Sequence, residues 1–130
     1  MTRHREVENW LRAALYDWET AQDMFRAGRF PYTVFFCHLA IEKALKARIH
    51  KITGKTPPKS HDLILLLRLA NLSPPSDIRD FMGKLSGAST ATRYPADLQE
   101  ILKTYTREAV QEYLGKTKET LRWIENHVRS

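Results

Sequence analysis

The sequence of 130 residues is long enough to bury a sizeable core, and we expect residues 1–130 to form one domain. Its content of 42% hydrophobic and 28% charged residues excludes an intrinsically disordered chain. The formal net charge of +6 permits a polyanionic partner such as a nucleotide or RNA. It does not require one, because the basic residues are spread along the chain without a dense run.

Three features predict a cytoplasmic location. The longest apolar runs, at 33–41 and 63–72, are too short to span a bilayer. The first ten residues, MTRHREVENW, lack the apolar core of a signal peptide. The single cysteine, Cys37, excludes an intramolecular disulfide and is typical of a reducing compartment.

Apolar residues recur with a helical period nearly throughout the sequence, and no segment shows convincing strand alternation. A first helix is predicted over about 5–27, where Gly28 ends it. Pro31 suits the first turn of a second helix, which we expect to end at about residue 53, before Gly54.

Two short helices are expected next. Ser60 can cap a third helix over about 63–71, which is apolar on every side and is therefore predicted to be buried. Two prolines then break the chain, and Ser76 can cap a fourth helix. The small polar residues at 86–97 predict a loop, and Thr106 is expected to cap the last helix. Three long helices and two short ones predict an all-α fold, an up-and-down bundle of about five helices.

Polar residues cross the otherwise apolar second helix at four-residue spacing: His38, Glu42, Lys46 and His50. In the first helix, Asp17 lies at the margin of the apolar stripe, so its carboxylate needs a cationic partner. The candidates for that partner are Lys43, Lys46, His61 and Arg93. From spacing alone, Glu42 and Lys46 form an exposed ion pair, part of a functional pocket, or a buried structural pair.

No metal and no cofactor are expected. Cys37 is embedded among aromatic residues, and no spacing of histidine and cysteine resembles a zinc site. The sequence contains no glycine-rich phosphate loop and no nucleophile elbow. His61 is interpreted as a first-turn residue of the third helix, next to the favourably placed charge of Asp62.

Four segments, in this order, carry a resemblance to a known family: the first helix with Ala14, Asp17 and Ala21, then LAIEKALKARI (39–49), SHDL (60–63) and RYP (93–95). Over almost the whole chain they resemble the HEPN domain, a nucleotide-binding domain of higher eukaryotes and prokaryotes. The resemblance implies a helical bundle similar to the C-terminal domain of kanamycin nucleotidyltransferase, usually a homodimer. Such proteins are often encoded beside a minimal nucleotidyltransferase, which they assist by binding nucleotide or substrate, and some of these pairs are toxin–antitoxin modules.

The resemblance also implies a ligand-binding cluster made of Asp17, Glu42, Lys43, Lys46, His61, Arg93 and Tyr94. Arg93 would hold a phosphate through parallel hydrogen bonds, with Lys46 as a compact second charge. The same charges could instead form a buried salt network that only fixes the bundle.

Many HEPN proteins are metal-independent ribonucleases with an arginine followed, after four to six residues, by a histidine. Arg122 and His127 match this spacing formally, but Trp123 stands where a small polar residue is usual. Five helical steps place the two side chains about 140° apart, which does not suit a shared phosphate. Arg93 has no histidine at this spacing after it, although His61 could supply a base in space.

Three hypotheses follow. The favoured one is a dimeric binding module for a nucleotide or polyanion, without a complete catalytic apparatus, that acts with a separate nucleotidyltransferase. The second is an RNA-cleaving toxin that uses Arg93 with His61, with Arg122 and His127 as the less favoured pair. The third is a structural dimer whose polar cluster only fixes its geometry. Phe35, Phe36 and Leu39 are candidates for its contact surface, and packing on other helices of the same chain explains them equally well.

Overall fold

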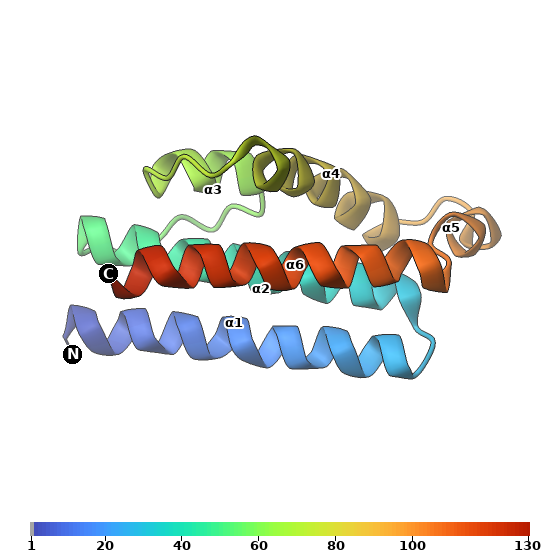
Figure 1. The fold of residues 1–130 in the computed structure, drawn as a ribbon, viewed down its shortest axis with the longest axis horizontal. Coiled ribbons are helices and arrows are strands. Elements are labelled where there is room, and N and C mark those ends of the chain that lie inside the picture. The colour runs from blue at the N-terminus through green and yellow to red at the C-terminus, as the bar shows by residue number, and fades with distance from the viewer. Residues whose placement is uncertain (1) are drawn as a thin grey trace.

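The computed structural model describes residues 2–130, and over this range it contains six helices and no strands (Figure 1). Their bounds are α1 (Arg3–Arg26), α2 (Phe30–Thr53), α3 (Leu63–Leu69), α4 (Ser76–Arg93), α5 (Leu98–Thr104) and α6 (Arg107–Arg129). The predicted all-α bundle is confirmed. None of the helices within residues 2–130 has the length and hydropathy needed to cross a membrane.

The central helix of the bundle is α2, which contacts each of the other five. Figure 1 shows α1 and α6 running alongside it, while α3 and α4 cover another side and α5 lies near the start of α6. The first half of α2 is buried on most sides because it is enclosed in this way. Val34, Cys37 and Ile41 have no exposed surface.

Local signals in the sequence set several helix ends. Gly54 follows α2 with φ of 71°, a left-handed conformation that glycine adopts without steric cost. Thr106 precedes α6, and its hydroxyl accepts a hydrogen bond from the backbone N–H of Ala109. Both predictions are confirmed.

The predicted loop over 86–97 is wrong for its first eight residues, because α4 continues to Arg93. Ala88, Ser89 and Thr92 are buried on this extension. The Thr92 hydroxyl donates to the backbone carbonyl of Ala88, 2.9 Å away. Small residues on this side allow the helix to pack closely, and this tertiary burial outweighs the low helix propensity of Ser89 and Thr92.

A further helix, α5, was not predicted. Asp97 caps it, since its side chain accepts from the backbone N–H groups of Gln99 and Glu100. None of the residues of α5 is buried, so no apolar stripe of the usual width marks this helix in the sequence.

The start of α3 also differs from the prediction. Asp62 is the N-cap, with its carboxylate accepting from the N–H groups of Ile64 and Leu65, whereas Ser60 accepts from the N–H of Asp62. His61 therefore precedes the helix instead of lying in its first turn. The helix is not buried on every side, because Leu69 is 42% exposed. At α4, Ser76 is the first helical residue and Pro75 occupies the cap position.

Candidate functional site

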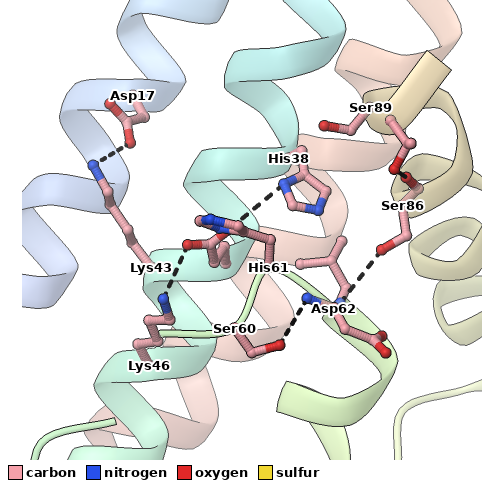
Figure 2. A network of polar contacts seen from close by, with 12 residues as sticks. Asp17, His38, Lys43, Lys46, Ser60, His61, Asp62, Ser86 and Ser89 are labelled. Atoms are coloured by element: carbon pink, nitrogen blue, oxygen red, sulfur yellow. Dashed lines mark hydrogen bonds and ion pairs between the residues drawn. The ribbon is translucent and has the colours of Figure 1, made fainter. Parts of the chain in front are cut away.

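Glu42 lies at the centre of a buried polar cluster on α2. Its side chain is only 5% exposed, and it accepts hydrogen bonds from Lys46 Nζ at 3.0 Å and from His61 Nδ1–H at 2.9 Å. His38 Nδ1 lies 3.7 Å from the same carboxylate. Figure 2 shows His38, Lys46 and His61 converging on this side of α2. The interpretation of Glu42 and Lys46 as an exposed surface pair is therefore excluded.

The histidine that completes this cluster comes from the connection between α2 and α3. His61 is bonded to the buried Glu42 through one ring nitrogen, while its side chain remains 58% exposed. Lys46, in contrast, is 7% exposed and lies 5.9 Å from the ring centroid of Trp10 on α1. The cluster thus joins three segments of the chain around one carboxylate.

Asp17 finds its partner in Lys43, one of the four candidates. The ion pair joins α1 to α2 at 2.7 Å, with Asp17 8% and Lys43 29% exposed (Figure 2). Burial of a carboxylate without such a partner would cost several kcal/mol, on the order of 3–5 kcal/mol for a pair broken on one side. This pair is separate from the pairs made by Glu42.

His38 belongs to the same cluster, and its side chain is neutral at pH 7. Burial lowers its pKa to about 4, an effect that the nearby Glu42 carboxylate opposes and the Arg93 guanidinium reinforces. His38 was part of the polar line on the second helix but was not predicted as a site residue. Its four-residue spacing from Glu42 was the signal that could have placed it in the site.

Arg93, at the last turn of α4, lies close enough to His38 for its guanidinium to lower the pKa of the imidazole. Its guanidinium carbon is 4.8 Å from the ring centroid of Phe35, and its Nε is buried without a hydrogen-bond partner. Arg93 lines a cavity of about 400 Å³ between the start of α2, the end of α4 and α5. Arg29, Tyr32 and Phe35 contribute to the same cavity.

The structure therefore divides the seven predicted ligand-binding residues. Glu42, Lys46 and His61 form one connected group, and Asp17 and Lys43 form a separate pair. Arg93 faces the cavity, and Tyr94 follows it with 74% of its surface exposed. Sequence reasoning did not find Arg29 or Tyr32, which gave no motif signal.

The two residues of the formal ribonuclease spacing in α6 have different surroundings. His127 Nδ1–H donates to the carbonyl oxygen of Trp123 at 2.8 Å, and the two rings are 4.1 Å apart between centroids. Arg122 lines a groove between α1 and α6 instead. Over residues 2–130, the structure has no group of three or more His, Cys, Asp or Glu side chains arranged to hold a metal ion.

These features define a class: an all-helical bundle with a charged cluster buried between its helices and an arginine-lined cavity at one end. A family model described as the HEPN domain matches residues 7–127. The chain belongs to the HEPN family.

Solved structures agree with this assignment. The fold is similar to the crystal structure of TT1696 from Thermus thermophilus, with a TM-score of 0.77 and 25% identity over 97% of this chain and 98% of that one. It is also similar to ST0689, an archaeal HEPN homologue, with a TM-score of 0.74 and 22% identity over 94% and 97% of the two chains. No curated protein matches the sequence.

Proposed function

We propose that this HEPN protein is a binding module that holds a phosphate group of a nucleotide, or of RNA, at Arg93. The proposal rests on which cationic side chains of the predicted site are paired with a carboxylate. Lys43 and Lys46 are neutralised by the buried carboxylates of Asp17 and Glu42, whereas Arg93 forms no ion pair with any of residues 2–130. An unpaired guanidinium beside a cavity is a favourable partner for a phosphate, which it can bind through two parallel hydrogen bonds.

The walls of the cavity support a nucleotide in particular. Arg29 is exposed and supplies a second cation on the same cavity. Tyr32 is 60% exposed there, and the Phe35 ring already lies beneath the Arg93 guanidinium. Aromatic rings next to cations suit a ligand that combines a stacked base with a phosphate.

In this proposal the buried network has a positioning role. Glu42 lies four residues from His38, which in turn lies close enough to Arg93 for the guanidinium to lower the pKa of the imidazole. The neutral His38 thus interacts with both the Glu42 carboxylate and the Arg93 guanidinium. The Arg93 charge thus remains available to a ligand instead of being neutralised by Glu42.

The proposed biological setting follows from the family. HEPN proteins are typically encoded with a minimal nucleotidyltransferase, and some of these pairs are toxin–antitoxin modules. We propose that this protein acts as a homodimer with such an enzyme. Co-purification with the product of the adjacent gene, followed by measurement of the complex mass by light scattering, tests this setting.

Nucleotide binding is tested by isothermal titration and thermal shift with a panel of adenine and guanine nucleotides. Arg93→Ala is expected to raise the Kd at least about tenfold, which corresponds to about 1.4 kcal/mol. Arg79→Ala is the matched control, because Arg79 is an exposed arginine of the same helix that does not line this cavity. A Kd that is equal in both variants, or no binding of any nucleotide, would contradict the proposal.

A second candidate function, metal-independent RNA cleavage, is favoured by the pairing of His61 with Glu42. The carboxylate holds Nδ1–H of an exposed imidazole at 2.9 Å, an arrangement that leaves Nε2 as the basic nitrogen. In the proposed reaction Nε2 removes the proton of a ribose 2′-hydroxyl. The 2′-oxygen then attacks the adjacent phosphorus. The bond from phosphorus to the 5′-oxygen of the next nucleotide breaks, and this oxygen leaves with the electron pair and takes up a proton from water, giving a 2′,3′-cyclic phosphate and a 5′-hydroxyl.

Incubation with labelled RNA in the presence of EDTA separates the two functions. Cleavage that is lost in His61→Ala and reduced in Glu42→Gln would establish the enzyme. His4→Ala serves as the control, since His4 is an exposed histidine near the start of α1. RNA that remains intact with the wild-type protein would eliminate this candidate.

A further inference from the structure

A groove between α1 and α6 is not used by the proposed function. It encloses about 250 Å³. Both α1 and α6 pack mainly on α2 and touch each other only to a small extent. Its floor is formed by the small buried residues Ala14 and Ala44, and its apolar walls by Leu15, Trp18 and Leu121. Leu15 is 57% exposed, so its side chain is accessible to a partner at the mouth of the groove.

The shape of the groove suits a helix. The residues that line it on α1 are spaced as on one helical face, from Glu8 to Trp18, and therefore extend about 15 Å. On α6 they run from Lys118 to Arg129 with the same kind of spacing. Small residues at the floor allow a third helix to approach closely, and apolar walls on both sides can receive its i, i+3, i+4 and i+7 side chains.

The charges at the edges of the groove are predominantly basic. Glu8 and Glu125 are both occupied, because Arg129 pairs with them at 2.7 and 2.9 Å and closes one end. Three further cations of the lining, Arg12, Lys118 and Arg122, are exposed and make no ion pair with any residue from 2 to 130. Arg122, half of the formal ribonuclease spacing, thus lies beside an apolar groove that His127 does not line.

We propose that this groove binds an amphipathic helix of another protein, with acidic side chains on both edges of its apolar face. A second copy of this chain is a poor occupant. Other exposed apolar residues, Tyr32, Leu98 and Leu102, surround a cavity that also contains Arg29 and Arg93. A second copy that docked through this surface would bring cations against Arg12, Lys118 and Arg122, in a chain whose formal net charge is already +6.

Fluorescence anisotropy with two labelled 18-residue peptides tests the proposal. Both peptides carry leucine at i, i+3, i+4 and i+7; one has glutamate at the flanking positions and the other has lysine. The glutamate peptide is expected to bind at least about tenfold more tightly than the lysine peptide. The Kd of the glutamate peptide should rise at least about threefold in each of three variants, Leu15→Glu, Lys118→Glu and Arg122→Glu. Combined substitutions should have larger effects.

Arg79→Glu is the matched control for Lys118→Glu and Arg122→Glu. It makes the same change in net charge as each of them, but on α4 and outside the groove, and should leave the Kd of the glutamate peptide unchanged. All substituted side chains are exposed, so circular dichroism should show folded proteins. Equal binding by the Arg122→Glu and Arg79→Glu proteins, or equal affinity for the two peptides, would overturn the proposal. Conversion of a dimer to a monomer by Leu15→Glu in sedimentation would overturn it too, because the groove would then belong to a second copy.

Discussion

Glu42 and His61 are joined by a 2.9 Å hydrogen bond, although one lies in the middle of α2 and the other in the connection that follows it. The bond fixes the connection against the central helix at the point where the Glu42 side chain would otherwise meet solvent. Glu42 also accepts from Lys46 on the same helix. Lys46 and His61 thus both bond to this carboxylate, and removal of the carboxylate should affect both side chains.

Glu42→Gln should destabilise the protein by about 3–5 kcal/mol, because it leaves the Lys46 ammonium buried without a counterion. The double variant Glu42→Gln with Lys46→Met should recover part of this loss, since neither buried charge then remains. Urea unfolding monitored by circular dichroism gives the free energies of unfolding. A single variant as stable as wild type would show that this pair is not important for folding.

His38 should make stability depend on pH. Its pKa in the folded protein is about 4, because burial disfavours the charged ring, whereas the ordinary value is 6.5. Above about pH 7.5 the ring is neutral in both states and contributes no pH dependence. As the pH falls from 6.5 to 4, the unfolded chain binds a proton that the folded protein does not, so the free energy of unfolding decreases.

The decrease that His38 contributes should reach about 3 kcal/mol near pH 4, at about 1.4 kcal/mol for each pH unit. It is measured as the difference between wild type and His38→Gln in urea unfolding at pH 7 and at pH 4.5. Glu42, Arg93 and His61 face the same ring and are present in both proteins. Equal losses of stability in the two proteins would contradict the assignment.

The sequence predicted the long helices well because their ends depend on local signals. Gly54 needs a left-handed backbone and Thr106 offers a capping hydroxyl, and both requirements are met within one turn of chain. The extension of α4 over Ala88, Ser89 and Thr92 depends instead on burial against other helices. Ser89 and Thr92 have low helix propensity, and their residue types do not indicate such burial by themselves.

The candidate site was predictable in part for a similar reason. Four-residue spacing places Glu42 and Lys46 next to each other on any helix, so their pairing followed from the sequence. The spacing does not show which loop covers that face, or that Arg93 lies on Phe35 and not on a carboxylate. Those relationships depend on how α4 and the α2–α3 connection pack on α2.

Cys37 should be chemically inert in the folded protein. It has no exposed surface, and burial raises the pKa of its thiol to about 12, so almost no thiolate is present at neutral pH. Its reaction with Ellman's reagent at pH 8 should be slower than in 6 M guanidinium chloride by at least about a thousandfold. Rapid reaction without denaturant would show that α2 is more accessible than the structure indicates.

Arg48 should be one of the side chains on which the bundle depends most. Its Nε donates to the carbonyl of Ala70 at the end of α3, and a terminal nitrogen donates to the carbonyl of His127 near the end of α6, each at 3.1 Å. One guanidinium thus satisfies carbonyl groups at two helix ends and places a positive charge where both helix dipoles favour it. Arg48→Met keeps the apolar stem but removes both hydrogen bonds, and should cost about 2–4 kcal/mol.

Arg48→Lys should recover only part of that stability, because an ammonium lacks the planar fork that reaches both carbonyls. Lys55→Met is the control, since Lys55 is an exposed lysine beyond the end of α2 and forms no side-chain ion pair with any of residues 2–130. Its stability in urea should match that of wild type. If Arg48→Met and Lys55→Met unfold at the same urea concentration, the two carbonyl contacts do not hold α3 and α6 on α2.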